Sequence, residues 1–353
     1  MGAGRGTIYF RCDAGLRYGL GHIMRCIALA QGFQKKGFIT TFLVRKLECA
    51  DLYRILLEKD NFHYIFLDDE AEGLECDLGG LSGHNNSTIV IFDNYDVTTS
   101  QMVEFKKKYS NLIAIDDMAD RDFCVDLIIN QNINAESLVY KTMGEVRFLL
   151  GTRYVLLRDD VLRMRKKENS IRHDPFVFMS FGGGDTFSRI KHLLGMFHHI
   201  DQRLESPLRI LWALPADAAQ IEKIEGITSD FKKIKIEMIS GNYELASIMK
   251  DADFAITAAG TSVFELAFLG VPQIVFIIDD NQEVTGRKVN EKGFGTFLGR
   301  SENAEEKEFI ELFFEFLRNR IMRQRMSKKG KAFIDGRGVE RVVDHIMDLY
   351  QLT

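Results

Sequence analysis

The chain has 353 residues and a formal net charge of −5, and 46% of its residues are hydrophobic. This length exceeds the usual size of one domain, so we expect two. The mildly acidic balance argues against nucleic acid as the main partner. No apolar run approaches the roughly 18 residues needed to span a bilayer, and no signal peptide opens the chain. We therefore expect a soluble protein without membrane contact.

The cysteines number five, all lie at or before Cys124, and none forms a CxxC pair. This usage is typical of reduced thiols in a cytoplasmic protein and disfavours a disulfide framework or a zinc site. The sequence also lacks a His and Asp cluster at metal-ligand spacing, so we expect no metal and no cofactor. The oligomeric state stays open, with a monomer as one alternative.

The first half alternates apolar, β-favouring runs with helical segments. It opens on a strand at residues 7–13, and the apolar residues between Ile23 and Phe33 recur at helical spacing until Gly37 ends the helix. The later elements are strands at 39–45, 63–68, 87–93, 111–117 and 126–132, and helices near 51–59 and 99–109. Such alternation predicts a parallel sheet covered by helices.

Residues 164–174 are charged and without periodicity, which predicts a linker. The pattern then restarts, with strands at 175–180, 209–215, 234–240, 254–260 and 273–279. We expect residues 1–163 and 175–353 to form two Rossmann-like, doubly wound α/β domains that face a cleft. The charged run 303–331 is expected to be a solvated amphipathic helical surface, and the last helix, at about 339–352, is a candidate to cross back to the first domain.

Residues 19–26, GLGHIMRC, place a histidine between a glycine turn and a helix, directly after a strand. An imidazole nitrogen can accept a proton from water near neutral pH, so His22 is the candidate catalytic base. A lone histidine is more often a capping or packing residue, but Gly19 and Gly21 remove side-chain bulk where a ligand would approach. The segment lacks the third glycine of a dinucleotide fingerprint, which disfavours NAD.

The second half carries two glycine turns at strand ends. Backbone amides of Gly182, Gly183 and Gly184 could cradle phosphate oxygens. A second strand-to-helix turn, 258–265, offers further donors, from Ala259, Gly260, Thr261 and Ser262, and ends on Glu265, a carboxylate that could accept both ribose hydroxyls. Taken singly, these residues could instead form a tight turn and a capping box between Ser262 and Glu265. Taken together, they predict a nucleotide site.

These motifs resemble the UDP-sugar hydrolases of pseudaminic acid biosynthesis, the PseG family, which share the two-domain GT-B architecture with the glycosyltransferase that makes the peptidoglycan lipid precursor. The matching segments are 11–30, 92–96, 115–132, 149–160, 180–185, 258–272, 279–282 and 335–342. The resemblance implies that His22 is the catalytic base, that Tyr95 lies near the sugar, and that the loop around Gly260 and Thr261 holds the diphosphate while Glu265 holds the ribose. The implied substrate contacts are Asp13, Gly19, Gly21, Arg25, Asn281 and Gln282.

The function that this resemblance implies is metal-independent hydrolysis of UDP-2,4-diacetamido-2,4,6-trideoxy-β-L-altropyranose to the free sugar and UDP. The C–O bond would break with inversion. UDP is a good leaving group, so the enzyme needs mainly to neutralise the diphosphate and to orient one water. Two alternatives remain. One is a GT-B glycosyltransferase that uses a UDP-sugar donor, and the other is a nucleotide-sugar-binding module without catalysis.

Overall fold

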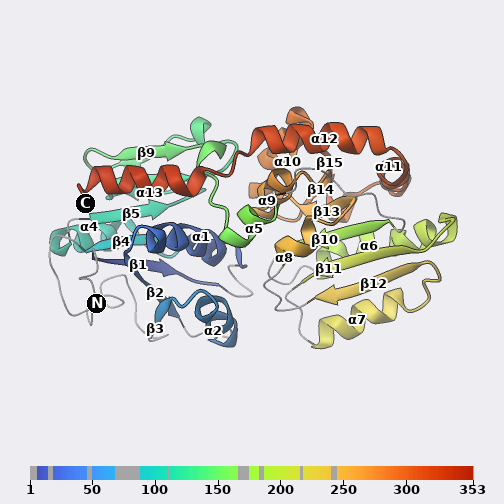
Figure 1. Cartoon of the computed structure of the whole chain (residues 1–353), viewed down its shortest axis with the longest axis horizontal. Helices are drawn as coiled ribbons and strands as arrows, with labels where there is room; N and C mark the ends of the chain where they lie inside the picture. The colour runs from blue at the N-terminus through green and yellow to red at the C-terminus, as the bar shows by residue number, and fades with distance from the viewer. Residues whose placement is uncertain are drawn as a thin grey trace. The chain divides into compact units, whose positions relative to one another are not determined.

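The structure is a computed structural model that describes residues 6–14, 19–45, 50–67, 88–109, 111–165, 175–182, 187–214, 218–239 and 245–352. The chain forms two compact units (Figure 1). Unit 1 comprises Met1–Asp159 together with Gly336–Thr353, and unit 2 comprises Asp160–Asp335. The first boundary thus lies at Asp159, compared with the expected residue 163. Most of the expected linker, 166–174, lies outside the described residues.

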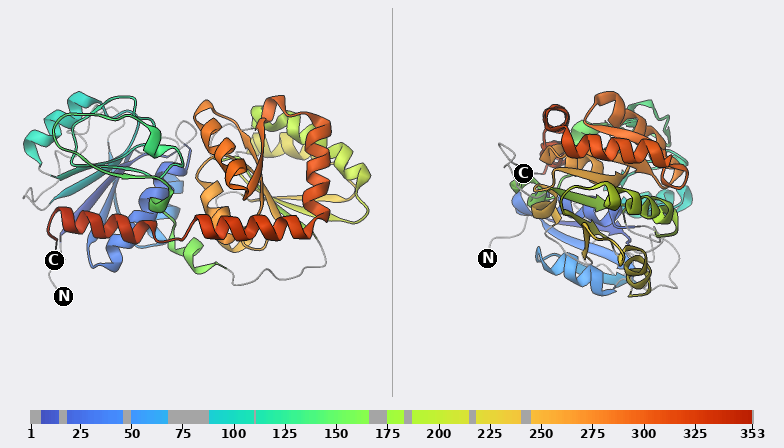
Figure 2. Two further views of the ribbon diagram at one scale, coloured as in Figure 1. Left: turned by 90° about the horizontal axis from the view of Figure 1, so that it is seen from above. Right: turned by 90° about the vertical axis from the view of Figure 1, so that its right-hand side faces the viewer.

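Unit 1 contains a seven-stranded sheet in the order β3-β2-β1-β4-β5-β7-β9. All of its pairings are parallel. The strands are β1 (Thr7–Cys12), β2 (Ile39–Arg45), β3 (His63–Leu67), β4 (Ile89–Asp93), β5 (Asn111–Ile115), β7 (Leu127–Asn130) and β9 (Arg147–Leu150). Every residue of β4 and β5 is buried, because helices cover both faces of the sheet (Figure 2). Strands β6 (Asp122–Phe123) and β8 (Lys141–Thr142) form a separate two-stranded parallel sheet.

The helices of unit 1 are α1 (Gly21–Lys35), α2 (Ala50–Glu58), α4 (Thr99–Lys108) and α13 (Gly338–Leu349). The last of these comes from the carboxyl end of the chain and packs against α1 (Figure 1). A side chain at Gly32 of α1 would collide with Val339 and Val343, so the glycine permits this close approach. Lys36 and Asp344 form an ion pair of 3.0 Å next to the contact.

Unit 2 contains a six-stranded parallel sheet in the order β12-β11-β10-β13-β14-β15. Its strands are β10 (Phe176–Ser180), β11 (Leu208–Ala213), β12 (Ile234–Ile239), β13 (Phe254–Ala258), β14 (Gln273–Ile277) and β15 (Gly295–Arg300). Its helices are α5 (Asp159–Arg163), α6 (Phe187–Arg203), α7 (Ala218–Thr228), α8 (Leu245–Met249), α9 (Ser262–Leu269), α10 (Glu283–Lys292), α11 (Glu306–Arg318) and α12 (Arg320–Phe333).

Helix α11 is the amphipathic helix expected in the charged run 303–331. Phe309, Phe313 and Phe316 of this helix are fully buried in the core of unit 2. Phe313 packs edge to face with Phe309 and with Phe254 of β13. The polar residues lie on the opposite face of α11, and its aromatic residues pack against the sheet of unit 2.

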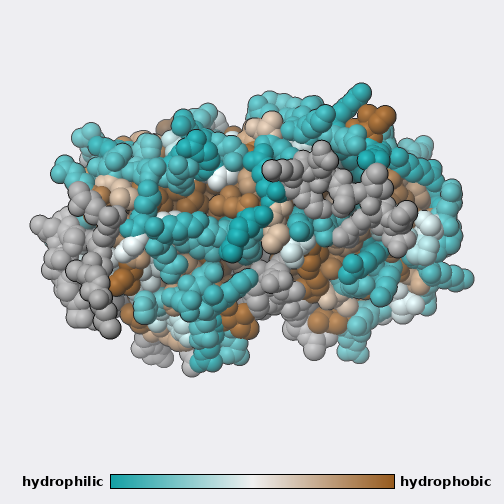
Figure 3. Space-filling view, viewed as in Figure 1, coloured by the Kyte–Doolittle hydropathy of each residue, from teal (hydrophilic) through white to brown (hydrophobic). Residues whose placement is uncertain are grey.

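Both sheets change direction of winding next to their first strand. In unit 1 this happens between β1 and β4, and in unit 2 between β10 and β13. Loops leave the carboxyl ends of these neighbouring strands in opposite directions, which opens a crevice where α/β sheets bind ligands. Polar side chains cover most of the described surface on the face seen in Figure 3. None of the helices in the described ranges is long and apolar enough to cross a membrane.

Candidate functional site

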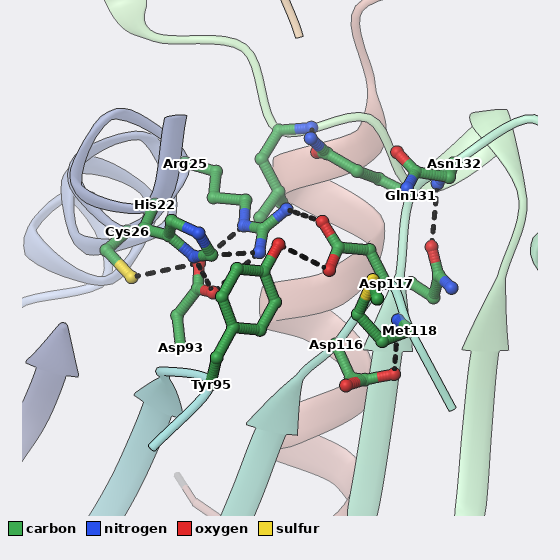
Figure 4. A network of polar contacts seen from close by, with 12 residues as sticks. His22, Arg25, Cys26, Asp93, Tyr95, Asp116, Asp117, Met118, Gln131 and Asn132 are labelled. Atoms are coloured by element: carbon green, nitrogen blue, oxygen red, sulfur yellow. Dashed lines mark hydrogen bonds and ion pairs between the residues drawn. The ribbon is translucent and has the colours of Figure 1, made fainter. Parts of the chain in front are cut away.

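The polar residues of unit 1 gather at the carboxyl edge of its sheet (Figure 4). The ends of β1 and β4 are aligned, because Cys12 pairs in register with Asp93. Strand β5 ends at Ile115 and is followed at once by Asp116 and Asp117. Helix α1 begins above this edge and directs His22 and Arg25, which are one turn apart, toward the strand ends.

His22 is bonded to a buried carboxylate. Its Nδ1 lies 2.5 Å from Oδ1 of Asp93, which is 1% exposed. Nη2 of Arg25 is 3.1 Å from the same ring nitrogen. A carboxylate oxygen at this distance can only accept, so we assign the proton to Nδ1. The assignment leaves the lone pair of the ring on Nε2.

Arg25 joins Asp93 to a second carboxylate. Its Nε donates to Oδ2 of Asp93, and its Nη2 donates to Oδ1 at 2.6 Å. The remaining nitrogen, Nη1, donates to Oδ2 of Asp117 at 3.1 Å. Burial alone would raise the pKa of Asp93, but the charges of Arg25 and His22 and their hydrogen bonds lower it to about 2. Asp93 is therefore ionised throughout the physiological pH range.

Tyr95 completes this network of side chains, because it contacts both Asp117 and His22. Its hydroxyl donates to Oδ1 of Asp117 at 2.8 Å. Its aromatic ring meets that of His22 edge to face, with centroids 4.7 Å apart and an interplanar angle of 89°. Burial and the charge of Asp117 raise the pKa of Tyr95 well above its usual value. The phenol therefore keeps its proton at neutral pH.

Three of the residues expected to contact the substrate lie in the segments next to this network. Asp13 is 2% exposed and its carboxylate is engaged by Arg11 at 2.8 Å, the backbone N–H of Arg45 at 3.0 Å and the amide of Asn94 at 2.9 Å. In the structure Asp13 thus ties together the carboxyl ends of β1 and β2 and the residue after β4. Gly19 has a φ of 69°, which a residue with a side chain rarely adopts, and Gly21 is the first residue of α1.

In unit 2, strand β13 pairs with β10 in the sheet. The turn after β13 leads into helix α9. Thr261 is the N-cap of α9, and its side chain makes no capping hydrogen bond. The capping-box alternative for Ser262 does not hold, because Ser262 is already the first residue of the helix. Glu265 lies in the first turn and is half-buried, and a side chain at Gly260 would meet nothing within 4 Å. Among the described residues, none therefore blocks an approach to the backbone at this glycine.

The other expected nucleotide residues lie around this turn. Gly182 follows β10, is exposed and has a φ of 84°, and Ala259 is 3% exposed at the end of β13. Gly183 and Gly184 lie outside the described residues. In the short helix η4 (Asp280–Gln282) after β14, Oε1 of Gln282 accepts from the backbone N–H of Ile278 at 3.0 Å. Gln282 thus shapes the turn, and Asn281 is exposed.

Sequence reasoning missed Asp93 and Asp117 as site residues. A signal was present, because each carboxylate directly follows or ends a buried strand, in IVIFD and in NLIAIDD. Carboxyl ends of adjacent parallel strands converge on one edge, so these positions could have been added to the site. Within the described ranges, no group of three or more His, Cys, Asp or Glu residues is arranged to hold a metal ion.

Comparison with known proteins finds one matching family model and several similar proteins. The family model of the glycosyltransferase family 28 C-terminal domain matches residues 215–340. The spore coat polysaccharide biosynthesis protein SpsG of Bacillus subtilis is 23% identical over 96% of this chain and 97% of its own length. The UDP-2,4-diacetamido-2,4,6-trideoxy-β-L-altropyranose hydrolase of Campylobacter jejuni is 23% identical over 81% of this chain and 97% of its own length.

The likeness extends to solved structures. MurG of Acinetobacter baumannii superposes with a TM-score of 0.64 at 16% identity, and the match covers 97% of this chain and 99% of MurG. At this identity the likeness concerns the fold alone. It confirms the expected two-domain α/β fold of the GT-B type.

Proposed function

We propose that this chain, which is similar to the Campylobacter hydrolase and matches the glycosyltransferase family 28 C-terminal domain, hydrolyses a UDP-linked diacetamido-trideoxy sugar to the free sugar and UDP. The proposed substrate is UDP-2,4-diacetamido-2,4,6-trideoxy-β-L-altropyranose, the sugar nucleotide that the name of the Campylobacter relative gives. One observation carries the proposal. His22 is held through Nδ1 by a buried, ionised Asp93, as a general base requires.

In the proposed reaction His22 accepts the proton of the attacking water on Nε2. Asp93 keeps the imidazole in the Nδ1–H tautomer and stabilises the imidazolium that forms. Arg25 holds Asp93 in place through two hydrogen bonds and supplies none of the protons. Tyr95 keeps its own proton, so it is suited to binding the sugar and not to competing as a base.

Unit 2 is proposed to bind the UDP moiety. The amino end of α9 is a site of positive potential, and the side chain of its N-cap residue, Thr261, makes no capping hydrogen bond. Gly260 leaves room for a phosphate to approach the backbone, and Gly182 lies in the turn after the adjacent strand, β10. Glu265, one turn into the helix, is proposed to accept hydrogen bonds from the ribose hydroxyls. Asn281, exposed after β14, is proposed to contact the sugar.

The bond expected to break is the one between the anomeric carbon and the diphosphate oxygen. Water forms a bond to the anomeric carbon while the C–O bond to UDP breaks, and UDP leaves with the electron pair. The water proton passes to His22. Such a displacement inverts the anomeric configuration through an oxocarbenium-like transition state. UDP leaves readily as an anion, so the reaction needs no strong general acid.

A glycosyltransferase is the second candidate, and the match of residues 215–340 to the family 28 C-terminal domain favours it. His22 would then deprotonate an acceptor hydroxyl in place of water. The two candidates are separated by incubating the purified protein with a panel of UDP-diacetamido sugars without acceptor, and by following UDP release and free sugar. Acceptor-free turnover that His22→Asn abolishes supports the hydrolase. Turnover only with an added acceptor supports the transferase, and binding without turnover supports a non-catalytic module.

A further inference from the structure

Asp117 accepts hydrogen bonds from Tyr95 and Arg25, two other residues of the network around His22. Its Oδ1 accepts from the hydroxyl of Tyr95 at 2.8 Å, and its Oδ2 accepts from Nη1 of Arg25 at 3.1 Å. A tyrosine hydroxyl has one proton and two lone pairs. Because that proton is directed at Asp117, the oxygen of Tyr95 has only lone pairs left for a ligand.

The direction of this hydrogen bond is set by the chemistry of the neighbours. A guanidinium can only donate, and the other two donating nitrogens of Arg25 are directed at Asp93. Arg25 therefore holds Oδ2 of Asp117 as an acceptor, and the second oxygen of the same carboxylate is also an acceptor. Tyr95 remains protonated, because burial and Asp117 raise its pKa. The hydroxyl of Tyr95 must then be the donor in its bond to Asp117.

The turn after β5 keeps Asp117 at this position. Oδ2 of Asp116 accepts from the backbone N–H of Met118 at 3.0 Å and from that of Ala119 at 2.8 Å. Ala119 has a φ of 53°, in the left-handed region that residues with a side chain rarely adopt. A strained conformation of this kind persists only where its surroundings hold it, and it is often found at functional sites. Asp117 is thus presented from a tightly held turn.

We infer that Asp117 is a positioning residue that makes Tyr95 a hydrogen-bond acceptor, so that the site selects a sugar carrying an N–H donor. The inference rests on the proposed function, in which the sugar carries acetamido groups. An acetamido N–H can donate to Tyr95. An acetoxy group of the same shape offers only oxygen lone pairs, and two facing acceptors leave both unpaired.

The test compares pairs of UDP-sugars. In each pair, one sugar carries an acetamido group at a given carbon, and the other carries an acetoxy group there, so that an oxygen replaces the N–H. One pair is prepared for each acetamido position. For one position, the wild type should favour the amide by about ten-fold in kcat/KM, mainly through KM. Tyr95→Phe should reduce this preference to nearly one. Asp117→Asn should reduce or reverse it, because an amide nitrogen can donate to Tyr95 and release the phenolic proton toward the substrate.

Asp120→Asn is the matched control, since Asp120 lies in the same loop, is exposed and pairs with Arg121. It should keep the wild-type preference. An equal preference in the wild type and in Tyr95→Phe overturns the inference, and so does an unchanged preference in a folded Asp117→Asn variant. A purely structural role would lower the melting temperature and leave the preference unchanged. If Asp117→Asn does not fold, the Tyr95→Phe comparison decides.

Failure of the proposed function is a separate outcome. It would appear as an absence of hydrolysis for both the amide and the ester of every pair. Calorimetric binding of the same pairs to the wild type, Tyr95→Phe and Asp117→Asn then still tests the inference. A preference for the amide that needs the hydroxyl of Tyr95 supports it, and equal binding of both analogues overturns it.

Discussion

Nδ1 of His22 and Oδ1 of Asp93 lie 2.5 Å apart, although the two residues are 71 positions apart in sequence. The contact joins the first turn of α1 to the end of β4. It directs the lone pair of the imidazole to Nε2 and places a permanent negative charge behind the ring. The first predictions concern this pair.

Replacing His22 by Asn removes the proposed proton acceptor and keeps a polar side chain. Turnover of the UDP-sugar should fall by about 10²- to 10⁴-fold, which is typical for loss of a general base. UDP binding, measured by calorimetry, should persist because His22 belongs to unit 1. Turnover close to that of the wild type would show that His22 is not the base.

Replacing Asp93 by Asn should also lower turnover by about 10²- to 10⁴-fold. The amide nitrogen can donate to Nδ1, which moves the ring proton to Nε2 and removes the lone pair that accepts from water. Asp201→Asn is the matched control, because Asp201 is a buried carboxylate of α6 in unit 2 that accepts from the backbone N–H groups of Lys233 and Ile234. It should lower stability while the folded fraction keeps turnover near the wild-type level. Equal losses in both variants would contradict the role of Asp93.

Asp93 should also make stability depend on pH in the acid range. Its pKa is lowered from 3.8 to about 2 in the folded protein, so its contribution is complete above about pH 4 and is lost as the pH falls through 2. The shift corresponds to roughly 2 kcal/mol. The difference in unfolding free energy between wild type and Asp93→Asn, from urea titrations, should shrink by about that amount between pH 5 and pH 2. A constant difference would argue against an ionised Asp93.

Glu265→Ala should weaken UDP binding by more than about ten-fold, because it removes a charged acceptor of the ribose hydroxyls. The matched control is Glu308→Ala, since Glu308 occupies the first turn of another helix, α11, and is exposed. It should bind UDP like the wild type. Calorimetry with UDP alone measures both. Unchanged affinity in Glu265→Ala would leave this glutamate with a structural role only.

Hydrolysis in ¹⁸O-enriched water should place the label in the released sugar and not in UDP, because water is expected to attack the anomeric carbon. The first sugar product observed by NMR should have the opposite anomeric configuration, before mutarotation mixes the anomers. Label in UDP would mean attack at phosphorus. His22 would then need a different role.

The sequence by itself determined most of the strands of both sheets and the alternation of strands and helices along the chain. Buried runs such as NLIAI and FAITA are apolar throughout because parallel strands are covered on both faces, and this pattern is visible without a structure. It also pointed to His22 and to the turn at Gly260, since both directly follow a strand and begin a helix. Strands β9 and β15 were missed, because β9 is only four residues long and glycines interrupt β15.

Only the tertiary structure decided what His22 contacts. Arg25 reaches Asp93 over 68 positions and Asp117 over 92, and local periodicity carries no information about such distant pairs. They meet because β1, β4 and β5 are neighbours in the sheet and end at one edge. The same holds for α13, which returns to unit 1 through the space that Gly32 leaves for Val339 and Val343. Pairing of parallel strands and packing of helix faces are non-local, and these two interactions assemble the carboxylates around the histidine.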